Sequence, residues 1–458
     1  MKQRSKYFFA GAVMVLLFTA CRKNSLDTSY PINGLGGDTW VKGPIDKWIY
    51  DSLTVPFNIE VLYKWDQFQD GDITKTLVPP DESKVIPLLT TIMRVWIEPY
   101  IKAGGLNFVK RMTPKQIALV GSPSYNSNGS ITLGEAEGGK KILLYTVNDF
   151  TTGDREAVKR RLRTIQHEFG HILHQTILFT PDYERITSGD YTGDWTNQSL
   201  ATALSKGFIS PYSMSSKEED FVEMIAHMLM EGPDGFDAIV NSSSTAAGVA
   251  ALRKKQAMIV SYFKTAWNID FSLLQRYVQQ ALDALSPSPP LSVSLGNNKL
   301  YKSMRFHSSF VQTSQRFADS VTKANNLLKA FNGNGGRYID SLILAFPFAD
   351  TLLFRVKYIN PASGANLVAE FRFKFTTSAG EMTFGPVVIY PTRSTPDANA
   401  DVIKATMTPI TDFISGKTFI PKWPNGTPDW SLPVRVGGLY LKTDQTAYIL
   451  GQLNAGIN

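Results

Sequence analysis

The sequence predicts an α+β fold in which a mainly helical region is followed by a β-rich one. Apolar residues recur at helical spacing through most of residues 154–285. Beyond the Ser/Pro-rich segment 286–292, short β-prone runs alternate with turn residues. With 458 residues, 43% of them hydrophobic, the chain is long enough for two or three domains with separate cores. The formal net charge of +7 is spread along the chain, so we expect no nucleic-acid partner.

The first 40 residues are expected to direct export and anchoring. Lys2, Arg4 and Lys6 precede an apolar run that ends at Ala20, which indicates a signal peptide over residues 1–20. Cys21 is the only cysteine and follows directly, at a position that resembles a bacterial lipobox, where the thiol is acylated. The alternative is a buried free cysteine within an ordinary signal peptide. Residues 21–40 are polar and glycine-rich, and we expect them to form a flexible tether.

Residues 41–285 are expected to form one domain of mixed structure. The pattern predicts a strand over 56–65 and a helix over 81–103, which Pro79-Pro80 precedes and Gly104-Gly105 follows. Short β-prone runs cover 116–120 and 141–147. Helices are predicted for most of the remainder.

Residues 293–458 are expected to form a β-rich domain behind the stiff linker 286–292. One stretch with helical spacing covers 316–331. The β-prone runs that follow cover 338–346, 351–359, 367–376 and 383–390. We find no catalytic pattern in this region.

The segment 154–176 has the pattern of an amphipathic helix with histidines on its second face. Its apolar residues follow spacings of four, three, four and three and therefore share one face: Val158, Leu162, Ile165, Phe169 and Ile172. His167 and His171 are four residues apart and fall nearly opposite that stripe. We therefore expect the stripe to pack into a core and the histidines to face a cleft.

The sequence His167-Glu168-Phe169-Gly170-His171 suits a zinc site. Two imidazoles one helical turn apart can reach the same zinc ion, and Glu168 is rotated away from the ligand positions. Its carboxylate is then free to accept a proton from water that attacks a carbonyl. The chain has 5 histidines, three of which fall within residues 167–174. The alternative is a solvated histidine face on an ordinary helix.

A later helix offers the third ligand, Glu219. Glu223 lies one turn further on the same face and is expected to accept a hydrogen bond from a ligand histidine. The alternative role for Glu219 is a capping box with Ser216. His174 lies about 10 Å along the axis from the first histidine of the motif, too far to bind the same ion, so we place it in the cleft or in a supporting role. Gly232-Pro233 is expected to stop this helix.

The sequence resembles gluzincins of the anthrax lethal factor type. This resemblance is carried by the motif 167–171, by Tyr212 and by the run 219–223. In those enzymes a tyrosine seven residues before the glutamate ligand stabilises the oxyanion, and Tyr212 has this offset from Glu219. The chain resembles even more closely the zinc-binding metallopeptidase lipoproteins of Bacteroidetes-type bacteria. The features that carry this second resemblance are the lipobox, the segment around the motif and residues 207–212. That resemblance covers roughly residues 40–285.

The resemblance implies a zincin-like fold for 41–285 and a zinc-dependent metallohydrolase that acts on a peptide or protein. It also implies an outer-membrane lipoprotein associated with nutrient-import machinery. Arg22-Lys23-Asn24 stands where such lipoproteins often carry an acidic run that is linked to surface display. The sequence therefore does not decide between the periplasmic and the external face of the outer membrane. The alternative function is a tethered accessory or binding lipoprotein with a structural or vestigial metal site. The run 141–147 is either the edge strand that pairs with substrate in zincins or a plain core strand.

Overall fold

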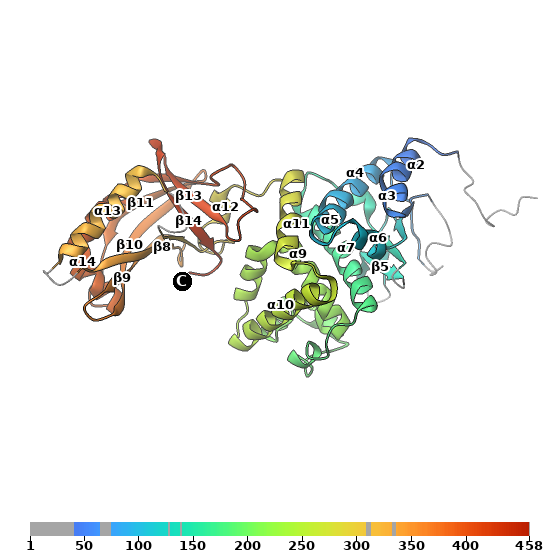
Figure 1. The fold of residues 1–458 in the computed structure, drawn as a ribbon, viewed down its shortest axis with the longest axis horizontal. Coiled ribbons are helices and arrows are strands. Elements are labelled where there is room, and N and C mark those ends of the chain that lie inside the picture. Colours follow the sequence, from blue (N-terminus) through green and yellow to red (C-terminus); the bar gives the residue numbers. More distant parts are fainter. Residues whose placement is uncertain are drawn as a thin grey trace, which may run out of the picture. The chain divides into compact units, whose positions relative to one another are not determined.

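The computed structural model describes residues 41–64, 75–126, 129–137, 140–307, 313–331 and 336–457 (Figure 1). The predicted signal peptide 1–20, Cys21 and the tether 21–40 lie outside these ranges and stay predictions. Among the helices of the described ranges, none is long and apolar enough to cross a membrane.

The strand predicted over 56–65 is mostly wrong. Helices α2 (Pro44–Ile49) and α3 (Val55–Phe57) flank a π-helical turn, and β1 spans only Glu60–Leu62. Asn58 adopts a left-handed conformation (φ 57°) and ends α3, so extended backbone begins only after it. Trp65 lies outside the described residues.

The helix predicted over 81–103 is confirmed, with one irregularity. α4 (Glu82–Ile92) continues through a π-helical turn, η2 (Met93–Ile97), into α5 (Glu98–Gly104). α6 (Leu106–Met112) follows after Gly105.

The predicted β-prone runs 116–120 and 141–147 form neighbouring strands of a four-stranded sheet. The strand order is β1, β2 (Gln116–Leu119), β6 (Lys141–Leu144) and β5 (Gly134–Glu137). The first three are parallel and β5 is antiparallel to β6. The edge-strand interpretation of 141–147 is therefore wrong and the core-strand interpretation is confirmed, because β6 pairs on both sides. Its apolar residues are buried, as expected for an inner parallel strand.

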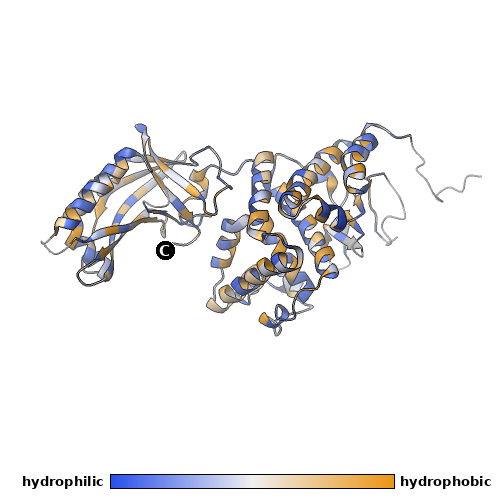
Figure 2. Cartoon of the chain, in the orientation of Figure 1, coloured by the Kyte–Doolittle hydropathy of each residue, from blue (hydrophilic) through white to orange (hydrophobic). Residues whose placement is uncertain are grey.

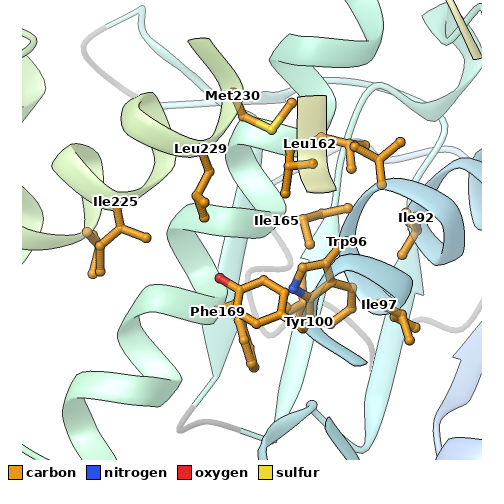
Figure 3. Packing of buried hydrophobic residues seen from close by; sticks show 14 of the residues in the cluster. Ile92, Trp96, Ile97, Tyr100, Leu162, Ile165, Phe169, Ile225, Leu229 and Met230 are labelled. Atoms are coloured by element: carbon orange, nitrogen blue, oxygen red, sulfur yellow. The ribbon is translucent and has the colours of Figure 1, made fainter. Parts of the chain in front are cut away.

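The motif helix is α7 (Arg155–Thr176), and it packs against helices on two sides. Its predicted apolar stripe is buried throughout. Phe169 makes edge-to-face contacts with Trp96 and Tyr100, with ring centroids 5.2 and 5.0 Å apart. Figure 3 shows this packing, with side chains of α9 on the far side of α7: Ile225, Leu229 and Met230. Since α9 covers the histidine face as well, that face is less open than predicted.

The rest of this domain is helical, as expected. The helices are α8 (Leu200–Ser205), α9 (Lys217–Asn241), α10 (Ala246–Trp267) and α11 (Phe271–Leu285), with short 3₁₀ turns before α9. The predicted stop at Gly232-Pro233 is confirmed as a break within α9, where two helical segments meet at a kink. Gly232 leaves the helical region (φ 68°, ψ 179°), and a second helical segment resumes because proline is tolerated in the first turn of a helix.

The C-terminal region forms a closed eight-stranded antiparallel barrel. Its strands follow the order β10-β11-β12-β13-β14-β7-β8-β9 around the barrel. Their bounds are β7 Ser303–Phe306, β8 Tyr338–Ala345, β9 Thr351–Asn360, β10 Ala365–Ser378, β11 Glu381–Val388, β12 Thr418–Lys422, β13 Val436–Leu441 and β14 Asp444–Asn454. The four predicted strands are confirmed as β8 to β11, and the helix predicted over 316–331 is confirmed as α13 (Gln315–Ala330).

Two helices share the apolar core of the barrel strands. α13 packs on α14 (Thr395–Ile414), and α14 packs on β10. A third helix, α12 (Leu291–Ser294), precedes β7. Figure 2 shows hydrophobic and hydrophilic residues alternating along these strands and helices, the pattern of elements that bury one side. α14 and strands β7, β12, β13 and β14 were not predicted.

Candidate metal centre

The start of α7 sets the register of the motif. The Asp154 side chain accepts hydrogen bonds from the backbone N–H groups of Glu156 and Ala157 and so caps the helix. The helix then runs without a break through His167, Glu168 and His171. Both histidines therefore project from one side of a rigid element, one turn apart.

The structure brings His167, His171 and Glu219 together. The Glu219 Oε2 atom lies 3.0 Å from His167 Nε2 and 3.4 Å from His171 Nε2. Ligand atoms about 2.0–2.1 Å from a tetrahedral zinc ion are roughly 3.3 Å from each other, so these separations suit zinc. Glu219 Oε2 is also buried without a hydrogen-bond partner among the described residues, and a cation would satisfy it. The donor set fits zinc in atom type and in spacing.

The second nitrogen of each ring is held by another side chain. His167 Nδ1 lies 2.9 Å from Glu223 Oε1, and His171 Nδ1 lies 3.0 Å from His174 Nε2. These contacts leave Nε2 of both rings directed at Glu219. His174 supports a ligand histidine, and it is buried rather than placed in a cleft. Burial, and then the nearby His171, lower the pKa of His174 to about 4, so its ring is neutral near pH 7.

Glu223 connects the metal ligands to the loop before α9. Besides His167, its carboxylate accepts a hydrogen bond of 2.6 Å from Ser210 Oγ and lies 3.4 Å from His227 Nε2. The sequence interpretation did not assign a role to Ser210 or His227. His227 could have been found, because it lies one turn after Glu223 on the same helix face. Nothing in the sequence distinguishes Ser210 from other loop serines.

Ser216 and Glu219 form only half of the predicted capping box. The Ser216 hydroxyl accepts a hydrogen bond of 3.2 Å from the Glu219 backbone N–H and so caps α9. The Glu219 side chain points instead to the histidines. Burial opposes ionisation of this carboxyl, but the rings of His167 and His171 beside it lower its pKa to about 2. Glu219 is therefore an anion, as a metal ligand must be.

Glu168 lies beside the three candidate ligands without joining them. Its side chain is on α7 between the two histidines and is 6% exposed. Burial raises its pKa, an effect that the neighbouring histidines partly offset. A carboxylate with a raised pKa is a better proton acceptor, which suits a general base.

Tyr212 completes the group of predicted residues. It begins the 3₁₀ turn η6 (Tyr212–Met214), and its ring stacks on His167 with centroids 5.8 Å apart. The rings of Trp195 and Tyr212 also make an edge-to-face contact, with centroids 4.9 Å apart. Burial, and then Glu219, raise the pKa of the phenol, so the hydroxyl keeps its proton at neutral pH and can donate it in a hydrogen bond. The side chain is 37% exposed, so a ligand can reach it.

Comparison with known proteins gives this arrangement a family. A family model described as "Putative zinc-binding metallo-peptidase" matches residues 38–272. The chain is also similar to a crystal structure described as a "putative zinc-binding metallo-peptidase" from Bacteroides caccae, with 30% sequence identity and a TM-score of 0.47. That match covers 53% of this chain and 92% of the other. No curated protein matched the chain. The protein belongs to the family that this model describes as "Putative zinc-binding metallo-peptidase".

Proposed function

We propose that the protein is a zinc-dependent peptidase of the gluzincin type, with a zincin-like catalytic domain. The observation that carries this proposal is the convergence of His167, His171 and Glu219 beside the unligated carboxylate of Glu168. Three protein ligands leave one tetrahedral position open, as in catalytic rather than structural zinc sites.

Each residue of the centre then has a distinct task. His167, His171 and Glu219 would hold the zinc ion, which supplies a Lewis acid that makes water more acidic and polarises a carbonyl. Glu168 accepts the proton of the attacking water and later delivers it to the leaving amine. The Tyr212 hydroxyl donates a hydrogen bond to the oxygen that gains negative charge. Glu223 and His174 fix the orientation of the ligand rings.

Strand β5 provides a place for an extended substrate. It forms the edge of the four-stranded sheet, and its start touches α7 at Thr164, one turn before Glu168. Glu135 of β5 is close enough to act electrostatically on Glu168. An edge strand offers backbone donors and acceptors to a peptide, so we propose that the substrate backbone pairs along β5.

The alternative function, an accessory lipoprotein with a structural metal, explains the centre less well. A structural zinc site needs four ligands and has no use for a buried carboxylate such as Glu168. It also has no use for Tyr212, a partly exposed side chain that stacks on His167.

Metal removal and restoration test the proposal. We expect purified protein to contain about one zinc per chain by mass spectrometry and to cut members of a peptide library. Chelation should abolish cleavage, and one equivalent of zinc should restore it. A metal-free protein that retains its full activity would contradict the proposal, as would a zinc-loaded protein that cuts no peptide.

A further inference from the structure

A small cavity lies between the first half of α7 and the residue before β5. Its volume is about 230 Å³, below the ~300–1,000 Å³ typical of pockets for larger ligands, so it suits a single side chain or a chain end. Its lining comes from α7, from the segment before it and from the residue before β5: Leu133, Thr146, Asp149, Phe150, Ala157, Arg160, Arg161 and Thr164.

The cavity is on the side of α7 that carries Glu168. Ala157, Arg161 and Thr164 precede Glu168 by eleven, seven and four residues, close to whole numbers of helical turns. Thr164 is therefore about 6 Å from Glu168 along the helix axis. Residues of an extended peptide advance about 3.3 Å each, so the cavity is within reach of a residue one or two positions from a bond held at Glu168.

Strand β5 lies close both to the cavity and to Glu168. A Cβ atom on Gly134 would lie 2.2 Å from Thr164 Cγ2, so strand and helix are in contact beside the cavity. The next residue, Glu135, acts electrostatically on Glu168. A peptide along β5 would therefore pass both the cavity and Glu168.

The lining carries a net positive charge from two arginines and one aspartate. Arg161 is 8% exposed and is held by hydrogen bonds from its guanidinium to the carbonyl oxygens of Tyr145 and Thr146. Its Nε atom is buried without a hydrogen-bond partner among the described residues. Arg160 is exposed and forms no ion pair with a carboxylate in the described ranges, whereas the exposed Asp149 acts electrostatically on Arg161 and offsets part of its charge. An unsatisfied buried donor beside a free guanidinium favours an anionic ligand.

We propose that this cavity is a specificity pocket that binds a carboxylate of the substrate. The carboxylate pairs with Arg160, and the positive charge of the immobile Arg161 stabilises it further. The preferred substrates are then peptides with a carboxylate within about two residues of the scissile bond. This proposal rests on the proposed peptidase function. The carboxylate can belong to an acidic side chain or to the chain terminus, because both present the same group.

Cleavage of matched peptides tests the pocket. One cleavable peptide is made with Glu, Gln or Lys at each position around the scissile bond, and all of these peptides have amidated C-termini. A further peptide has neutral side chains at these positions and a free C-terminal carboxylate. We expect wild-type kcat/KM to favour a carboxylate peptide over its neutral counterpart by about fivefold or more, and less at high salt. The Arg160→Gln protein should cleave both peptides with a kcat/KM ratio close to one. The Arg160→Glu protein should cleave the Lys peptide with a higher kcat/KM than the Glu peptide. Arg111→Gln, a matched change at an exposed arginine on α6, should leave the ratio as in wild type.

The outcomes separate the possible failures. Preference for an amidated Glu peptide identifies a side-chain carboxylate, and preference only for the free terminus identifies the chain end. Equal cleavage of all peptides, or an Arg160→Gln protein with wild-type preference, overturns the pocket and leaves the peptidase standing. No cleavage of any peptide overturns the proposed function instead. Fluorescence anisotropy of the same peptides with zinc-loaded protein measures the preference without turnover, and equal binding of Glu and Gln peptides counts against the pocket.

Discussion

Hydrogen bonds around His167 and His171 decide which ring nitrogen each histidine offers to an ion. Glu223 and His174 occupy the Nδ1 positions, so the two Nε2 atoms converge on Glu219. A neutral imidazole that donates from Nδ1 has its lone pair on Nε2, which is the form that binds a metal. The candidate centre is thus organised by residues outside the three that would bind the ion.

Tyr212→Phe tests the proposed hydrogen bond to the oxyanion. The ring would keep its contacts with His167 and Trp195, so the zinc content should stay at the wild-type level. We expect kcat to fall by about 10²-fold with little change in KM, because the lost interaction acts mainly in the transition state. Tyr125→Phe, at an exposed tyrosine of the same domain, is the matched control. A Tyr212→Phe enzyme with wild-type kcat would remove this residue from the mechanism.

At the residue scale, helical geometry predicted most of the centre. The spacings of His167, Glu168 and His171 on one helix, and of Glu219 and Glu223 on another, are local and can be read from the chain. The contact of Ser210 with Glu223 depends on how the loop before α9 folds back on that helix. Such a contact joins different elements, and no local pattern encodes it.

The element that presents Glu219 is held in place by a buried ion pair. Asp220, the residue after Glu219, lies 2.6 Å from Lys255 of α10, and both side chains are fully buried. Lys255 also donates to the carbonyl oxygen of Gly207, and Tyr191 donates to Asp220. These bonds tie the start of α9 to α10 and to the loop that leads to Tyr212.

Lys255→Met should destabilise the fold markedly. Removal of the ammonium leaves the Asp220 carboxyl buried without its charged partner, a change that typically costs about 3–5 kcal/mol. We expect a clear drop in the midpoint of thermal unfolding, and the Asp220→Asn/Lys255→Met double variant should recover part of it. Lys254→Met changes the adjacent, exposed lysine and should leave the midpoint nearly unchanged. Equal midpoints for the two single variants would show that the pair does not hold α9.

At the scale of helices and strands, the predictions were correct for elements with a strong local hydrophobic pattern. They were wrong for elements whose structure depends on pairing with distant parts of the chain. The helices α7 and α13 have long apolar stripes, and both were predicted. α14 was missed because it contains Pro396 and Pro409 and several threonines, which weaken the helical pattern. The edge position of β5 was missed because its sequence, with Gly134 and two glutamates, has little β preference.

At the scale of the whole molecule, the sequence predicted the order of a helical and a β-rich domain but not the closure of the barrel. Closure depends on pairings between strands far apart in the chain, such as β7 with β14. β13 also contains the adjacent glycines Gly437 and Gly438, which hide its strand pattern. A candidate metal centre built on two packed helices could therefore be predicted more fully than the β-rich region that follows it.

The central claim is that the protein hydrolyses peptides with a zinc ion and Glu168 as general base. The most direct measurement is kcat/KM of the Glu168→Gln protein together with its zinc content, with Glu156→Gln on the exposed first turn of α7 as the matched control. We predict that Glu168→Gln keeps about one zinc per chain and loses roughly 10²- to 10⁴-fold in kcat/KM, whereas Glu156→Gln resembles wild type. A zinc-loaded Glu168→Gln protein that cleaves peptides at the wild-type rate would contradict the account.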